Sequence, residues 1–120
     1  MKVLIVEDDT LVREFAVAAL GDAGFEVIEA ATGEEAIERA LAGPDAVLLD
    51  LRLPGRLNGW DVADRLRQQR PDLPVVYASG TAPEAGRDLT GSRFLPKPYS
   101  SKDVIVAICE QVCEGSKSTS

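Results

Sequence analysis

Three consecutive acidic residues, Glu7 to Asp9, follow the apolar run KVLIV, and another acidic residue, Asp50, ends the apolar run AVLLD. Carboxylates that lie close together repel one another, which raises the pKa of at least one of them unless a cation neutralises the group. Oxygen ligands of this kind suit a hard divalent cation such as Mg²⁺. These residues predict a cation site if the fold brings the two runs together.

Two further polar residues follow apolar runs in the second half of the chain. Ser79 ends the run VVYAS, and Lys97 lies just after FLP. A hydroxyl and an ammonium group are both suited to phosphoryl oxygens. The chain contains no histidine, which excludes Ser/His and Cys/His catalysis and leaves a carboxylate as the best available nucleophile. Asp50 is therefore the candidate nucleophile, and its product would be an acyl phosphate.

The elements that position these residues alternate between short apolar strands and helical patterns. Strands are predicted at residues 2–6, 25–30, 45–50, 74–79 and 93–96, and helices at 11–20, 32–41, roughly 59–70 and after Ser100 or Ser101. Asp9 is expected to cap the first helix. This alternation indicates an α/β fold with a doubly wound, five-stranded parallel sheet. Ligands of such sheets bind beyond the carboxyl ends of the strands, where the polar residues above should converge.

Composition excludes several function classes. The chain has 20 acidic and 13 basic residues among 120, a net charge of -7, which does not suit binding to nucleic acid or an anionic membrane. No apolar run approaches the roughly 18 residues of a membrane span, and the first residues turn acidic too early for a secretory signal. We expect a cytoplasmic protein with one domain at residues 1–114 and a disordered polar tail at 115–120.

These motifs together resemble the receiver domain of bacterial two-component response regulators, the family of the chemotaxis regulator. The resemblance rests on VEDD after the first strand, LLDLRLPGRLNGW around the third, YASG at the fourth and FLPKPY at the fifth. It implies a flavodoxin-like sheet with strand order 2-1-3-4-5. It also implies a signalling switch that catalyses its own phosphorylation and dephosphorylation and is not a turnover enzyme.

The resemblance assigns the reactive groups. Asp50 matches the phosphoacceptor, and Glu7 and Asp8 match the acidic pair that holds Mg²⁺, with Mn²⁺ as an alternative ion. Asp50 and the backbone carbonyl of Arg52 would complete the protein ligands, and Lys97 matches the lysine that pairs with the phosphate. The donor would be a phosphohistidine of a sensor histidine kinase or a histidine phosphotransfer protein.

Other positions match residues that transmit or time the signal. Ser79 matches the switch hydroxyl, and Phe94 matches the aromatic residue that turns inward on activation. Arg52 and Thr81 match the positions that tune the lifetime of the phosphoryl group, and Pro98 would follow a cis peptide. The output would be a changed affinity for a downstream protein, with the chain a monomer or weak dimer.

The segment between Ser79 and Lys97 is a few residues shorter than in typical receivers. It contains Pro83, Gly86 and Gly91, and Leu89 is its only large apolar residue. A surface helix needs an apolar stripe to offset the entropy of ordering. We therefore expect a shortened or irregular fourth helix and a mobile loop beside Ser79.

Alternatives to a receiver switch remain open at this point. A Mg²⁺-dependent phosphatase of the haloacid dehalogenase type also uses a strand-end Asp, but its general-acid Asp two residues later would fall on Arg52. A receiver that serves as a phosphate sink, or as part of a hybrid histidine kinase, would carry the same residues. A degenerate receiver that acts only as an interaction module is a further alternative, although every chemically required side chain is present.

Overall fold

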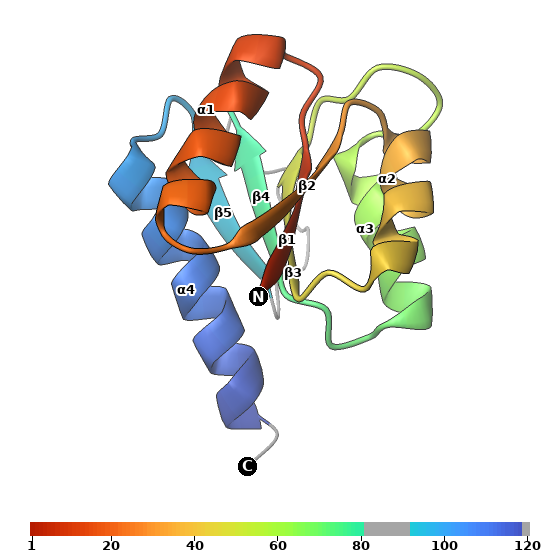
Figure 1. Cartoon of the computed structure of the whole chain (residues 1–120). Helices are drawn as coiled ribbons and strands as arrows, with labels where there is room; N and C mark the ends of the chain where they lie inside the picture. The colour runs from red at the N-terminus through yellow and green to blue at the C-terminus, as the bar shows by residue number, and fades with distance from the viewer. Residues whose placement is uncertain (81–91, 119–120) are drawn as a thin grey trace.

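The computed structural model describes residues 1–80 and 92–118, with side chains of the last helix as far as Val112. Its five strands form one parallel sheet in the order β2-β1-β3-β4-β5 (Figure 1). They span Lys2–Val6 (β1), Glu26–Ala30 (β2), Ala46–Asp50 (β3), Val75–Ser79 (β4) and Ser92–Pro96 (β5). The predicted strands and their order are confirmed.

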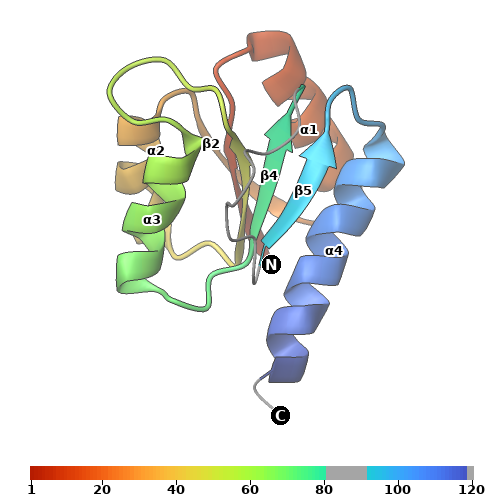
Figure 2. The same cartoon turned by 180° about the vertical axis from the view of Figure 1, so that it is seen from behind.

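Helices cover both faces of the sheet, as the alternation predicts. They span Thr10–Asp22 (α1), Gly33–Arg39 (α2), Gly59–Gln69 (α3) and Ser101–Ser118 (α4), and a short 3₁₀ turn spans Ala40–Ala42 (η1). Helices α1 and α4 pack together on one face, and α2 and α3 on the other (Figures 1 and 2). The fold is therefore the doubly wound, flavodoxin-like α/β fold. No helix in the described part of the chain is both long and apolar enough to cross a membrane.

A separate apolar core fills the space on each side of the sheet. The core under α2 and α3 includes Leu4, Leu49 and Trp60, and the core under α1 and α4 includes Ile5 and Ile108. Successive residues of a strand point to opposite faces, so the central strands β1, β3 and β4, which are covered on both faces, are apolar except at their ends. Each large buried side chain contributes roughly 1.5–3 kcal/mol, which makes these three strands a firm support for groups at their carboxyl ends.

Side-chain caps start the helices at the same edge of the sheet. Asp9 Oδ1 accepts hydrogen bonds from the backbone N–H groups of Leu11 and Val12, which confirms its predicted capping role. The other caps are Thr32 on α2, Asn58 with Asp61 on α3, and Ser100 with Asp103 on α4. Caps satisfy backbone N–H groups that have no partner within the helix, so they fix where the chain turns near the carboxyl ends of the strands.

Two expectations differ from the structure or lie outside it. The predicted tail at 115–120 is not separate from the last helix, because α4 continues to Ser118. Gly115 lowers helix propensity by only about 1 kcal/mol relative to alanine, which is not enough to end the helix. Residues 81–91, and with them Thr81 and the predicted irregular fourth helix, lie outside the described residues.

Candidate functional site

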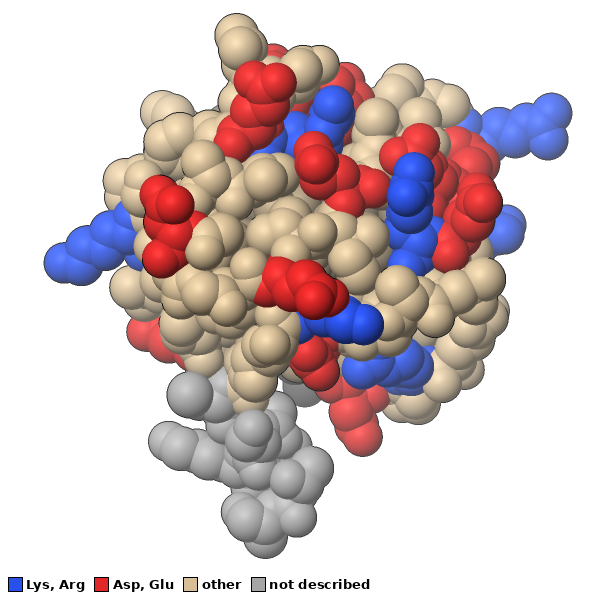
Figure 3. Space-filling model, in the orientation of Figure 1, with Lys and Arg blue, Asp and Glu red and all other residues tan. Residues whose placement is uncertain are grey.

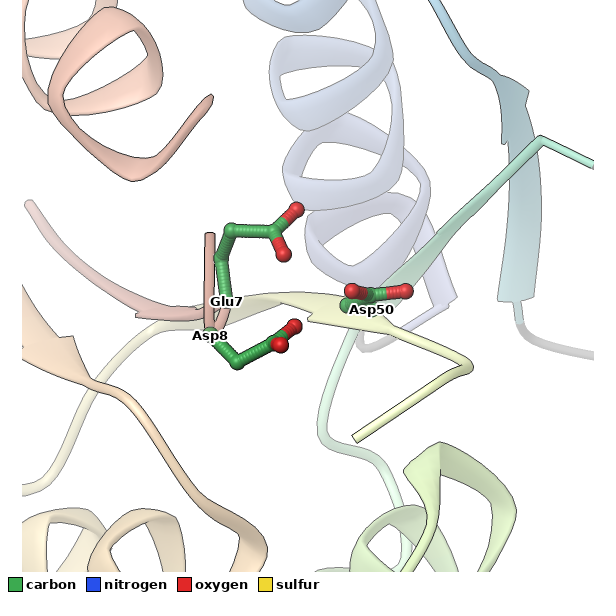
Figure 4. Close-up of side chains that lie close together, drawn as sticks. All are labelled: Glu7, Asp8 and Asp50. Atoms are coloured by element: carbon green, nitrogen blue, oxygen red, sulfur yellow. The ribbon is translucent and has the colours of Figure 1, made fainter. Parts of the chain in front are cut away.

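The carboxyl edge of the sheet brings three carboxylates and one ammonium group together. Oxygens of Glu7, Asp8 and Asp50 lie within 4.8 Å of one another, and these side chains converge in Figure 4. Lys97 Nζ lies 2.5 Å from Glu7 Oε1 and 3.3 Å from Asp50 Oδ2. Four of the five polar residues that the sequence places at this edge, all except Ser79, are therefore brought together here.

The register of the parallel strands explains this convergence. Val6 pairs with Leu49, so Glu7, the residue after β1, lies level with Asp50 at the end of β3. Glu7 is 4% exposed and Asp50 is 5% exposed, whereas Asp8 is exposed. The cluster thus has two carboxylates packed against the sheet and a third on its solvent side.

Both buried carboxylates are oriented by hydrogen bonds. Glu7 Oε2 accepts from the backbone N–H of Asp9 at 3.3 Å, while its other oxygen faces Lys97. Asp50 Oδ1 accepts from the backbone N–H of Arg52 at 3.0 Å, and its Oδ2 faces Lys97. Because hydrogen bonds to an ionised group are stronger than neutral ones, each side chain is held in place before any ligand binds.

The pKa values of these groups reflect burial first and the neighbouring charges second. Burial, and then the hydrogen bond and charge of Asp50, raises the pKa of Glu7 to about 7, although Lys97 acts in the opposite direction. Burial lowers the pKa of Lys97, but its contacts with Glu7 and Asp50 outweigh burial and leave this pKa raised. Burial, and then the charges of Glu7 and Asp50, raises the pKa of Tyr99 to about 12. A single lysine therefore does not neutralise the cluster.

The donor set fits a hard divalent cation. Three carboxylates face one ammonium group, and Mg²⁺ needs only one or two carboxylates, other oxygen ligands and water. Zinc sites usually include nitrogen or sulfur ligands, and neither histidine nor cysteine belongs to this cluster. Glu7, Asp8 and Asp50 are thus the residues that would hold Mg²⁺.

The remaining predicted residues lie around this centre. Ser79 ends β4 and is buried, and its carbonyl accepts a hydrogen bond from the Lys97 N–H at 2.8 Å. Phe94 of β5 pairs with Tyr77 of β4 and packs against the core under α2 and α3. The Lys97–Pro98 peptide is cis, as the resemblance implies.

Gly59, which the sequence places where the loop after the third strand meets the third helix, has a steric role next to Asp50 that the sequence did not predict. A Cβ atom at this position would lie 2.4 Å from the Asp50 carbonyl oxygen and 2.6 Å from Leu51 Cα. Its N–H also donates to the Leu51 carbonyl at 3.1 Å. Helix α3 can therefore begin directly against the end of β3 only if this residue lacks a side chain.

Arg13 is a second residue that the sequence analysis did not select. Its Nη1 donates to the Glu7 carbonyl oxygen at 2.8 Å, and its Nε lies 3.2 Å from Glu29 Oε1. The signal available in the sequence was a basic residue in the first turns of the helix that follows the acidic run. That signal is weak because most basic residues on a helix point to solvent.

An apolar groove of about 410 Å³ opens beside the site. Its lining comes from the first turns of α1 and from the segment after β5, namely Leu11, Val12, Phe15, Lys97, Pro98 and Tyr99. Leu11 is 78% exposed and Phe15 is 42% exposed, so large apolar side chains face solvent next to the charged cluster. Such a patch is typical of a surface that contacts another protein.

Comparisons with known proteins agree with this geometry. Residues 3–109 match the family described as the response regulator receiver domain. The chain is 37% identical over 113 residues to the response regulator MprA of Mycobacterium leprae, covering 90% of this chain and 49% of that protein. It is 38% identical over 117 residues to the sensor kinase CckA of Brucella abortus, covering 92% of this chain and 12% of the kinase.

A solved structure of a receiver protein has the same fold. The crystal structure of a response regulator receiver protein from Sinorhizobium medicae superposes with a TM-score of 0.86 at 32% identity, covering 96% of each chain. The chain spans about half of the MprA regulator and a much smaller part of the CckA kinase.

Proposed function

The chain belongs to the family of response regulator receiver domains, and we propose that it is a phosphoacceptor switch in which Asp50 accepts the phosphoryl group. The observation that carries this proposal is the contact of Lys97 with both Glu7 and Asp50, beside the carboxylate of Asp8. Phosphoryl transfer needs a positioned nucleophile and positive charge around the transferred group, and this cluster supplies both.

In the proposed reaction, a carboxylate oxygen of Asp50 attacks the phosphorus atom of a phosphohistidine on a partner protein. A P–O bond forms while the P–N bond breaks, and the electron pair of that bond stays on the donor's imidazole nitrogen. The donor histidine lies outside these 120 residues, because they contain none. The N–H of Arg52 and the ammonium of Lys97 orient the two oxygens of Asp50 for this attack.

The cation site would be formed by Glu7, Asp8 and Asp50, with the backbone carbonyl of Arg52 as a further ligand. Bound Mg²⁺, or Mn²⁺, would offset negative charge on the transferred phosphoryl group. Lys97 adds a second positive charge on the side of Glu7. The chain would promote its own phosphorylation and the later hydrolysis of the acyl phosphate, without turnover of a separate substrate.

We propose that the signal passes from Asp50 through Ser79 to Phe94. A phosphorylated Asp50 would attract the Ser79 hydroxyl, and the space vacated would admit the half-buried Phe94. Arg52 and Thr81 would tune the lifetime of the phosphoryl group by controlling access of water. The result would be a changed surface around β4, β5 and α4.

The proposed phosphodonor is a sensor histidine kinase or a histidine phosphotransfer protein, and the proposed receiver domain spans residues 1–114. The groove beside Lys97 supports such a partner, because a protein that docks there would lie next to Asp50. The similarity to a response regulator and to a sensor kinase fits a regulator, a phosphate sink or the receiver part of a hybrid kinase. In each case the chemistry at Asp50 would be the same.

A phosphatase of the haloacid dehalogenase type is the weaker alternative. That enzyme class needs a general-acid Asp two residues after its nucleophile, where this chain has Arg52. The family match to receiver domains also weighs against it.

The proposed function is tested by labelling with a small acyl phosphate. With Mg²⁺ and acetyl phosphate, intact-mass spectrometry should detect one added phosphoryl group on the wild-type chain. Removal of the cation with EDTA, or the substitution Asp50→Asn, should abolish this mass change. Equal labelling of wild type and Asp50→Asn would disprove the assignment of Asp50.

A further inference from the structure

Both backbone polar groups of Glu7 are held by residues outside the cluster, one in the edge strand β2 and one in helix α1. The Glu7 N–H donates to the Ala30 carbonyl at 3.0 Å. The Glu7 carbonyl accepts from Arg13 Nη1 at 2.8 Å, and Arg13 Nε in turn lies 3.2 Å from Glu29 Oε1. The peptide groups that carry the acidic pair are therefore fixed by contacts outside the cluster itself.

The Arg13 side chain is placed to hold the Glu7 carbonyl in one position. It is only 19% exposed, whereas its partner Glu29 is 50% exposed. The guanidinium presents its donors in a fixed planar arrangement. The contact with Glu29 therefore sets the plane of the guanidinium, and a second donor in that plane binds the Glu7 carbonyl. The pair lies on the wall of a hollow of about 420 Å³ between α1, β2 and α2, away from the oxygens that face Asp50.

We propose that Arg13 is a positioning residue for the divalent-cation site: by holding the Glu7 carbonyl, it fixes the turn that carries the Glu7 and Asp8 side chains over Asp50. This inference rests on the proposed function, because it concerns the same cation site. Without the Arg13 donor, the Glu7 carbonyl would lose a charge-assisted hydrogen bond, and the turn that carries Glu7 and Asp8 would adopt more than one arrangement.

The positioning role and a purely electrostatic role predict opposite results. Loss of the Arg13 positive charge leaves the surroundings of the cluster more negative, which on electrostatic grounds alone would strengthen Mg²⁺ binding. Loss of positioning weakens binding, because the ligands must then be ordered when the ion binds. We expect the loss of positioning to outweigh the loss of charge, so that Arg13→Gln binds Mg²⁺ more weakly than wild type.

The experiment titrates the 120-residue chain with Mg²⁺ and follows the fluorescence of its one tryptophan, Trp60. Arg13→Gln should raise the Mg²⁺ dissociation constant about threefold to tenfold. Arg13→Lys keeps one donor for the Glu7 carbonyl and should give a smaller increase. Glu29→Gln keeps an acceptor for Arg13 and removes a half-exposed charge, so its dissociation constant should change less than about twofold.

The matched control is Arg67→Gln. Arg67 also donates to a backbone carbonyl, that of Leu73, but Leu73 precedes β4 and lies at the opposite end of the sheet. This substitution should lower the free energy of unfolding without changing the Mg²⁺ dissociation constant. As a readout that needs no metal, the amide NMR shifts of Asp8 and Asp9 should move in metal-free Arg13→Gln and not in Arg67→Gln.

The outcomes separate this inference from the proposed function. If the wild-type chain does not bind Mg²⁺, or if Asp8→Ala binds Mg²⁺ as tightly as wild type does, both the positioning role and the proposed function are overturned. If wild type binds Mg²⁺ and Arg13→Gln binds it equally or more tightly, only the positioning role is overturned. If Arg13→Gln does not fold, Arg13→Lys decides the question, and an unchanged dissociation constant together with unchanged amide shifts in that variant overturns the positioning role.

Discussion

At the scale of single residues, the charge of Glu7 depends strongly on its surroundings. It shares Lys97 with Asp50 while both carboxylates are almost fully buried. Its pKa is raised from 4.5 to about 7, so the folded protein keeps a proton that the unfolded chain releases between these pH values. Stability from this group is therefore complete below about pH 4.5 and is lost as pH rises through about 7.

We predict that metal-free protein loses roughly 3 kcal/mol of this contribution between pH 4.5 and pH 8. Urea unfolding at pH 5 and pH 8 measures most of this loss, and Glu7→Gln, which cannot ionise, should flatten the difference. Mg²⁺ should reduce the loss in wild type because the ion replaces the proton as the neutralising charge. The same pH dependence in wild type and Glu7→Gln would contradict the assignment of this titration to Glu7.

The residues of the cluster were predictable because strand periodicity locates them. An Asp at the end of a buried apolar run must lie at the carboxyl edge of a parallel sheet, as Asp50 does. Arg13 and Gly59 were not predictable in the same way. Their roles depend on how closely α1 approaches the Glu7 carbonyl and α3 approaches the end of β3, and that spacing is set by tertiary packing, which leaves no periodic signal.

At the scale of elements, the contact between the start of α3 and the end of β3 leaves no room for an added side chain. Gly59→Ala would place a methyl group against the backbone of Asp50 and Leu51, which cannot move aside as a flexible side chain could. We predict a loss of roughly 2–3 kcal/mol in the free energy of unfolding and slower labelling of Asp50 by acetyl phosphate. Urea unfolding and timed intact-mass measurements test both effects.

Gly21→Ala is the matched control for this prediction. Gly21 lies inside α1 and a Cβ atom there would meet nothing within 4 Å. The same substitution should therefore stabilise the protein by up to about 1 kcal/mol through helix propensity. Equal effects of the two substitutions would show that packing against Asp50 does not determine the need for glycine at position 59.

Helix starts were easier to predict than helix ends. Asp9, Thr32 and Ser100 are capping residues whose side chains act locally, and each caps the helix that follows it, at or close to the start that the sequence predicts. The sequence predicted a tail after residue 114 because glycine and serine are poor helix formers. Their cost in helix propensity is small, and the preceding turns pack against the sheet, so α4 continues beyond that residue. The 3₁₀ turn after α2 ends at Gly43, whose positive φ of 73° allows the chain to reverse toward β3.

At the scale of the whole molecule, acidic and basic side chains intermix on the face seen in Figure 3, whereas the cation site concentrates like charge at one edge of the sheet. Binding of an ion to the folded state alone raises stability in proportion to the logarithm of its concentration. We therefore predict that the unfolding temperature rises with Mg²⁺ concentration at neutral pH.

Asp8→Asn distinguishes this effect from non-specific salt stabilisation. Asp8 is exposed but belongs to a cluster of like charges, so its substitution should leave the unfolding temperature of metal-free protein unchanged or raise it. The Mg²⁺-dependent rise should be lost or strongly reduced. A rise of equal size in wild type and Asp8→Asn, measured by differential scanning fluorimetry at constant ionic strength, would contradict a site that includes Asp8.

The strand order has a further consequence for local unfolding. Asp50 ends β3, the middle strand of the sheet, whereas Glu29 and Ala30 belong to β2 and Lys97 follows β5, the two strands that pair on one side only. Strands with a single partner open at lower free energy than strands paired on both sides. Hydrogen exchange should therefore be slowest around the nucleophile and faster in the strands that supply its positioning contacts, so these contacts can adjust while the nucleophile stays fixed.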